Sequence, residues 1–349
     1  MMRELCALVA GDAVACPEDG RVPELLALAR THRVHLLLAQ RLACEDVRVE
    51  ARVEALRDAV RVRELLRVAA ALEANGCAPV VFKGAALALT HYGHSWQRPR
   101  LDADVLVDPA SRARAAATLA TLGYSRPPMT GGRYVMHQEM HVRPDPVVDE
   151  HVIDLHWRLA NPNLLASLPD HAELRARAVP VVLPEGALRV ASPVDALVVA
   201  CVHRAAHHAG SDELLWLYDI HLVASRLTAE EWALAVSLAG RAGVAALVGR
   251  GLDLAAQAFG ERAPATVRET LSAAPREASA LFLRTDLRPV DRLRADVAAL
   301  GAAKGVRLLA EHLFPPATYM RQKYGVRSVM LPLAYARRIV RGASGWWKR

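Results

Sequence analysis

The sequence feature that most constrains the fold is the stretch of residues 80–107, VVFKGAALALTHYGHSWQRPRLDADVLV. It begins with a short apolar run that leads to Gly84, where the missing side chain lets the backbone turn sharply and approach a ligand closely. Small and aliphatic residues at 85–92 favour a helix, and the unpaired amides at its N-terminus would attract phosphate. The stretch therefore predicts a strand, a turn at Lys83 and Gly84, and a phosphate-binding helix.

Two acidic residues lie on the next predicted strand, LDADVLV. Asp102 and Asp104 are two positions apart, so a strand places both carboxylates on the same face. The apolar residues 105–107 predict that this strand is buried, where two unpaired carboxylates are costly. Magnesium, which takes oxygen ligands and often carries substrate phosphates, explains the pair better than a surface turn does.

Three motifs follow one another in the chain: FKGAALAL, RPRLDADVLV and VIDLHWRL. In this order they resemble the nucleotidyltransferase superfamily related to DNA polymerase beta, and most of all its bacterial branch of uncharacterised nucleotidyltransferases, in which Lys-Gly replaces the usual Gly-Ser pair. The resemblance covers roughly residues 75–225, and Ala103 departs from it where the family often has a branched apolar residue. It implies a small mixed sheet, a metal-bound nucleoside triphosphate (NTP), and transfer of a nucleotidyl group to an acceptor.

A hairpin is expected downstream of the acidic strand. Residues 133–143 and 147–157 are strand-like, and the Pro-Asp-Pro sequence at 144–146 separates them. Because proline cannot donate a ladder hydrogen bond, we expect residues 144–146 to form the connection between the two arms.

The second arm supplies a third acid. Asp154 and His156 alternate with apolar residues in VIDLHWRL, so they share the polar face of the arm. Two-metal transfer needs ions roughly 3.5–4 Å apart, so a third carboxylate must come from an adjacent strand. Asp154 is the best placed, because Asp149 falls on the opposite face and Glu150 lies closer to the turn. A solvated carboxylate on an exposed sheet face is the alternative.

The resemblance implies two groups of site residues. The catalytic and metal-binding group consists of Asp102, Asp104 and Asp154. The nucleotide-binding group consists of Lys83, Gly84, Arg98 and His156. The metal would be Mg²⁺ or Mn²⁺, and Asp154 would also take the acceptor proton as general base. Simpler roles stay open for Lys83, as a solvated strand-end lysine, and for Arg98, as a loop anchor.

Length and composition favour a mainly helical protein. With 349 residues, two or three domains are expected, and the apolar content comes mostly from Ala, Leu and Val while aromatics make up only 5%. We therefore predict an α+β fold, in which a small mixed-sheet nucleotidyltransferase core at 76–190 is flanked by helical regions at 1–75 and 191–349. Helical patterns and caps lie at residues 23–42, 49–73, 112–122, 193–208 and 212–224.

Net charge and cysteine spacing limit the kinds of partner and the cellular compartment that we expect. The net charge of +7 suits an anionic partner such as an NTP, but no base-stacking aromatic cluster or known reading motif supports nucleic-acid binding. The arginines of 49–73 are best explained by pairing with Glu54 and Glu64 on a solvated helix face. The five cysteines show no paired spacing, and no signal peptide or membrane span is evident, so we expect a cytoplasmic protein.

The C-terminal stretch from about Gly325 is basic and includes Trp346, Trp347, Lys348 and Arg349. Two interpretations stay open: a helix packed on the body with a charged end, which we favour, and peripheral contact of an amphipathic tail with a membrane surface.

Two functions from different classes fit these features. The leading one is an Mg²⁺-dependent enzyme that transfers a nucleoside monophosphate from an NTP to a hydroxyl or phosphate of a small molecule, peptide or protein. The alternative is a non-catalytic, antitoxin-like regulator that binds a nucleotide or a protein on the same fold. A zinc site at His203 and His207 is disfavoured, because Arg204 stands where a metalloprotease needs glutamate.

Overall fold

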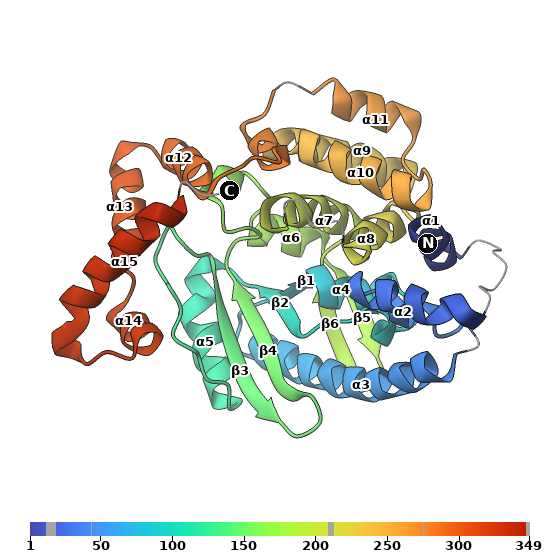
Figure 1. Ribbon diagram of the computed structural model, residues 1–349, viewed down its shortest axis with the longest axis horizontal. Helices are drawn as coiled ribbons and strands as arrows, with labels where there is room; N and C mark the ends of the chain where they lie inside the picture. The colour runs from blue at the N-terminus through green and yellow to red at the C-terminus, as the bar shows by residue number, and fades with distance from the viewer. Residues whose placement is uncertain (12–18, 43, 209–212, 275, 347–349) are drawn as a thin grey trace.

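A computed structural model describes residues 1–11, 19–42, 44–208, 213–274 and 276–346, with the backbone alone for residues 342–346. The described residues form an α+β fold with one six-stranded mixed sheet in the order β3-β4-β2-β1-β6-β5 (Figure 1). The strands are β1 Val80–Phe82, β2 Asp102–Leu106, β3 Gln138–Asp145, β4 Asp149–His156, β5 Val179–Leu183 and β6 Gly186–Val190.

The centre of the sheet is mixed. β1 runs antiparallel to β2 and parallel to β6, while β2 runs parallel to β4. Antiparallel hairpins, β3–β4 and β5–β6, form the two edges. The strands expected from the residues around 80, 104 and 152 are confirmed. The hairpin β5–β6 was not anticipated, although its short alternating segments around Pro184 and Glu185 are typical of one.

The position of the β3–β4 turn differs from the expectation, which was wrong. Pro144 and Asp145 are paired with Glu150 and Asp149 at the end of the ladder, and the turn occupies residues 146–148. Proline is tolerated here because β3 is an edge strand. The first arm is also shorter than expected, since it begins at Gln138.

Helices precede the sheet, as predicted: α1 Met2–Ala10, α2 Val22–Thr31 and α3 Glu45–Ala74. The helix expected over residues 23–42 ends early at Thr31, because Arg33 adopts a φ of 57° that a right-handed helix excludes. A 3₁₀ turn, η2 His35–Leu38, follows it. On α3, arginines pair with Glu54 and Glu64 as expected, through Arg61 and Arg67 at 2.7 Å each. The expected solvated face was wrong, because Glu64 is buried and the Arg61 side chain is only 13% exposed.

Helices within and after the core continue the chain. Those near the sheet are α4 Lys83–Thr90, α5 Arg112–Thr121, α6 His171–Arg177, α7 Pro193–His207 and α8 Leu214–Ala224. Those that follow are α9 Ala229–Ala242, α10 Ala245–Phe259, α11 Ala265–Ser272, α12 Pro289–Leu300, α13 Ala302–Leu313, α14 Ala317–Tyr324 and α15 Leu331–Trp346. Short 3₁₀ turns are η1 Asp19–Arg21, η3 Ser95–Gln97, η4 Pro109–Ser111, η5 Asn163–Leu165, η6 Ala278–Leu283 and η7 Ser328–Met330.

The two faces of the sheet enter separate cores. Ala103, Val105, Ile153 and Leu155 pack with α3 and α5 on one face, as period-two alternation predicts. Phe82 and Leu106 point the other way, into the larger core that includes α7, α8, α9 and α10. Asp102, Asp104 and Asp154 have the parity of this second face, so they lie under α7 and α8.

Some expectations fall outside the described residues. They concern the start of α8 at Asp212, the thiol of Cys16, and the tail residues Trp347, Lys348 and Arg349, together with the side chain of Trp346. The four described cysteines are free thiols. No helix of the described ranges combines the length and the apolar character that a bilayer crossing requires.

Candidate active site

A cavity of about 650 Å³ lies between the polar face of the sheet and helices α7 and α8. Six of the seven residues singled out in the sequence line it: Lys83, Gly84, Arg98, Asp102, Asp104 and Asp154. The seventh, His156, is 1% exposed and lies beneath the cavity floor, within reach of Asp104. The structure therefore gathers residues from β2, β4, the start of α4 and the loop before β2 around one space.

The carboxylates come together through strand register. Asp104 on β2 is the direct partner of Asp154 on β4, and Asp102 lies opposite Val152. Ligand atoms of Asp104, Asp154 and His156 all lie within 4.8 Å of one another. Among the described residues this is the one group of three or more His, Cys, Asp or Glu side chains with that spacing.

Asp104 is held in its ionised form. Its Oδ1 accepts hydrogen bonds from Lys83 Nζ at 2.7 Å and from His156 Nε2 at 2.9 Å. Burial acts to raise the pKa of Asp104, but Lys83 and His156 outweigh it, so the pKa lies well below the ordinary value. Burial together with Lys83 lowers the pKa of His156 to about 4, so its ring is neutral at pH 7 and donates from Nε2.

Asp154 has the opposite character. Burial, followed by repulsion from Asp104 and Asp102, raises its pKa to about 7. Asp102 is exposed, unlike Asp104, so the expectation of two buried carboxylates was wrong for this residue, which lies at the exposed start of β2. Partial desolvation and Asp104 shift its pKa in the same direction as that of Asp154. One acid of the group is therefore firmly ionised while its register partner titrates near neutrality, which is a common arrangement at catalytic sites.

The turn between β1 and α4 places Lys83. The left-handed conformation falls on Lys83, with a φ of 52°, and not on Gly84 as the composition of the turn suggested. A side chain in this region costs of order 1 kcal/mol or more, and such strain is found preferentially at functional sites. Here it accompanies an amine directed at Asp104.

Gly84 lets the Arg98 guanidinium lie close to the backbone. A Cβ on Gly84 would lie 2.5 Å from Nη1 of Arg98, closer than any real contact allows. Arg98 is 4% exposed and forms two hydrogen bonds with Asp219 on α8, at 2.9 and 2.6 Å, and Tyr92 donates a third to the same carboxylate at 2.7 Å. Arg98 therefore makes the contacts of a loop anchor, although it also lines the cavity.

The wall opposite the acids is aromatic. His203, His207, His208 and Trp216 line it, and the His208 ring stacks on Trp216 with centroids 4.5 Å apart. Nε2 of His203 lies 3.1 Å from Nε2 of His208. Burial and Lys83 lower the pKa values of His203 and His207, the latter to about 4, so these rings are neutral at pH 7.

The part of this wall that histidines contribute was missed in the sequence, where His203 and His207 were weighed only as zinc ligands. The signal that could have found it is the run HRAAHH followed closely by LLWLYD, which places rings at helical spacing on two consecutive helices.

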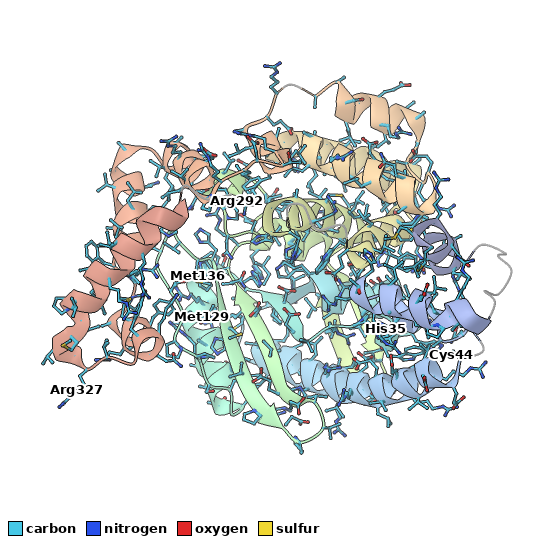
Figure 2. All side chains as sticks on the ribbon, viewed as in Figure 1. His35, Cys44, Met129, Met136, Arg292 and Arg327 are labelled. Atoms are coloured by element: carbon cyan, nitrogen blue, oxygen red, sulfur yellow. The ribbon has the colours of Figure 1, made fainter. Side chains whose placement is uncertain are left out.

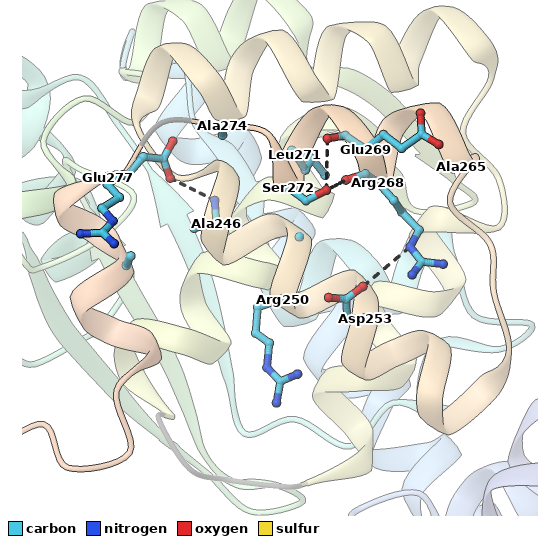
Figure 3. A pocket seen from close by; sticks show the side chains of 13 residues that line it. Ala246, Arg250, Asp253, Ala265, Arg268, Glu269, Leu271, Ser272, Ala274 and Glu277 are labelled. Carbon is cyan, nitrogen blue, oxygen red and sulfur yellow. Dashed lines mark hydrogen bonds and ion pairs between the residues drawn. The ribbon is translucent and has the colours of Figure 1, made fainter.

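A second pocket, of about 710 Å³, lies between α10 and α11, away from the sheet (Figure 3). Arg268 pairs there with Asp253 at 3.7 Å, and Glu277 accepts hydrogen bonds from the backbone of Ala245 and Ala246 at 3.0 Å each. Arg268 and Glu277 are thus engaged in contacts within the protein, and the cavity at the sheet, which gathers three acids and Lys83, is the stronger candidate site.

A mixed sheet with carboxylates on adjacent parallel strands beside a Lys-Gly turn defines a nucleotidyltransferase class of fold and site. A family model described as "Uncharacterised nucleotidyltransferase" matches residues 18–260, which is more than two thirds of the chain. The chain belongs to this family, and the resemblance noted in its sequence is confirmed. Comparison with curated proteins gave no match.

Proposed function

We propose that the chain is a metal-dependent nucleotidyltransferase that moves a nucleoside monophosphate from an NTP to a hydroxyl or phosphate group of a small molecule, peptide or protein. The observation that carries the proposal is the register of Asp104 with Asp154, which brings two carboxylates together in a cavity that also contains Asp102 and Lys83.

The acidic group fits a divalent ion. Carboxylate oxygens are the ligands that Mg²⁺ and Mn²⁺ prefer, and burial together with repulsion from Asp104 and Asp102 raises the pKa of Asp154 despite Lys83, which favours an added cation. Asp102, Asp104 and Asp154 would hold the metal. When bound, two such ions supply charge neutralisation for the triphosphate and acidify the acceptor oxygen.

The protein's own groups then have separate tasks. Lys83 carries the cation nearest the acids and can donate to a phosphate oxygen. His156, neutral and fully buried, donates to Asp104 and fixes the orientation of its carboxylate. Asp154, with a pKa near 7, is suited to accept the proton of the acceptor group.

The remaining walls position the nucleotide. The amides of the first turn of α4 are unpaired within the helix and offer donors to phosphate. The neutral rings of His208 and Trp216 offer an aromatic surface for a nucleobase. The buried pair of Arg98 with Asp219 ties α8 to the loop before β2, which fixes this wall against the sheet.

The test combines binding and turnover. Purified protein is titrated calorimetrically with each of the four NTPs in the presence of Mg²⁺, and pyrophosphate release is followed with candidate acceptors. Saturable binding of at least one NTP with release of pyrophosphate is expected. Binding without release would instead support a non-catalytic regulator that binds a nucleotide. Failure of every NTP to bind would overturn the proposed transferase and leave only the protein-binding regulator.

A further inference from the structure

The net positive charge of the chain is concentrated at its C-terminal end. Residues 301–349 contain ten Lys and Arg residues and a single acid, Glu311, so they carry a formal charge of +9. The whole chain is +7, which leaves residues 1–300 slightly acidic at −2. The described part of this stretch, residues 301–341, is called the C-terminal lobe below, and it comprises α13, α14, η7 and most of α15 (Figure 1).

Three cations of the lobe bond uncharged groups and not acids. Arg321 donates to Ser328, Lys323 to Tyr319, and Arg338 to the His312 carbonyl, all of which are uncharged groups. Glu311 is engaged inside the protein, where Oε2 accepts the Tyr134 N–H at 2.8 Å and Oε1 lies 3.5 Å from Arg307.

Two arginines of the lobe have no partner among the described residues. These are Arg327, just before η7, and Arg337 on α15. Figure 2 shows the Arg327 side chain projecting away from the body of the molecule. Both are therefore available to an external anion.

Apolar side chains lie on the same helical surface as these cations. Val329, Leu333 and Val340 are 82%, 62% and 73% exposed, and their spacing of four and seven places them along one side of the continuous η7–α15 segment. Arg337 lies between them at the position i+4 from Leu333. The opposite side, represented by Ala334 and Tyr335, packs inward, and Tyr335 donates to the Pro315 carbonyl.

We propose that this face of η7 and α15 binds the surface of an anionic lipid bilayer. An exposed stripe that mixes branched apolar side chains with unpaired arginines is the pattern of a helix lying in the membrane interface, with apolar groups below and cations at the lipid phosphates. A nucleic-acid backbone would use the cations but leave Val329, Leu333 and Val340 in water. An acidic protein partner would need a shaped recess, whereas these side chains stand on a convex helix surface.

The surface lies outside the family match, which ends at residue 260. It is also separate from the acidic cavity, none of whose lining residues comes from the lobe. Membrane binding and nucleotidyl transfer would therefore be independent properties of the chain. An experiment can contradict one proposal without contradicting the other.

The experiment is sedimentation of the full chain with vesicles of phosphatidylcholine alone and of phosphatidylcholine mixed with phosphatidylglycerol, at low and high salt. We expect binding to the mixed vesicles only, and release at high salt. The double variant R327E/R337E should bind at least about tenfold more weakly, since each lost cation is worth roughly fivefold. The variant V329N/L333N should also bind more weakly, because it removes the apolar part of the face.

Matched controls come from α3. Arg57 is an exposed arginine without a partner among the described residues, and Leu56 is 70% exposed. R57E and L56N therefore make the same charge reversal and the same apolar-to-polar change on α3, outside the C-terminal lobe. Both controls should bind like the unchanged protein, and circular dichroism checks that all variants fold. The proposal is overturned by absent binding to the mixed vesicles, by equal binding to both vesicle types, or by equal losses in the α3 variants.

Discussion

Asp104 and Asp154 occupy directly opposed positions on the parallel strands β2 and β4, yet their acidities are driven apart. Lys83 and His156 hold Asp104 ionised, whereas burial and its two acidic neighbours raise the pKa of Asp154 to about 7. The same backbone register thus produces one fixed anion and one group able to exchange a proton.

The first prediction concerns turnover. Asp154→Asn should reduce nucleotidyl transfer by roughly a hundredfold or more, because a positioned base or ion ligand is lost, while NTP binding and folding stay nearly intact. Asp149→Asn is the matched control, since Asp149 lies on the same strand with the opposite parity and at a φ of 64° that asparagine accepts readily. Initial rates of pyrophosphate release decide between them, and near-normal turnover in Asp154→Asn would exclude the assigned role.

The second prediction follows from the pKa of Asp154. Between about pH 4 and 7 the unfolded chain has released this proton and the folded chain keeps it, so in metal-free protein this group makes stability fall as the pH rises through that window. Asp154→Asn should remove this contribution and so be more stable than the unchanged chain at pH 8, and not at pH 4. Urea denaturation in the presence of a chelator measures the free energy of unfolding of both proteins at both pH values. A variant that is no more stable than the unchanged chain at pH 8 would contradict the prediction.

The third prediction concerns Lys83. Lys83→Ala should weaken NTP binding by about tenfold or more, because it removes the cation beside the acids from the cavity. Alanine shares the penalty of a positive φ with lysine, so the substitution leaves the strain of the turn unchanged. Arg57→Ala, which removes an exposed cation outside the cavity, should leave the dissociation constant unaltered. An unchanged constant for Lys83→Ala would remove this residue from the nucleotide site.

The fourth prediction compares two glycines. Gly84→Ala should destabilise the fold by about 1–3 kcal/mol, because its Cβ would drive the buried Arg98 guanidinium from its place. Gly240→Ala, inside α9 with nothing within 4 Å of the added Cβ, should stabilise it by about 0.4–1 kcal/mol. The denaturation midpoint should fall for Gly84→Ala and rise for Gly240→Ala. Shifts of equal sign would contradict the close approach of Arg98 to Gly84.

The fifth prediction concerns the pair of Arg98 and Asp219. Asp219→Leu should cost about 3–5 kcal/mol by leaving a buried guanidinium without its partner, and adding Arg98→Met should recover part of the loss. Glu50→Gln breaks the more exposed contact with Arg30 and should cost less than about 1 kcal/mol. If Asp219→Leu and Glu50→Gln cost the same free energy of unfolding, burial is not what makes the Arg98 pair important.

Local patterns in the sequence predicted much of this architecture. The alternation of LDADVLV and VIDLHWRL gave the correct faces for Asp102, Asp104 and Asp154, because side-chain parity is a property of one strand and its immediate neighbours. The start of the helix predicted from residue 193 is correct for the same reason, since the Ser192 side chain accepts a hydrogen bond from an amide only three residues away.

Long-range contacts could not be read in this way. Arg98 and Asp219 are 121 residues apart, and nothing local distinguishes a buried loop anchor from a phosphate ligand. The left-handed conformation of Lys83 similarly accompanies a tertiary pair with Asp104 and departs from the local preference for glycine. The tolerance of Pro144 in a ladder depended on β3 being an edge strand, which only the sheet order reveals.

The parallel pairing of β2 with β4 also determines when the site can exist. The chain between the two strands contains α5 and β3, so the pairing of Asp154 with Asp104 is non-local, and such pairings are slow to form. A nascent polypeptide that has emerged only as far as β3 already contains Lys83, Asp102 and Asp104 but lacks the strand that completes the acidic group. Synthesis therefore completes the acidic group before it supplies α7 and α8, the helices that line the opposite wall of the cavity.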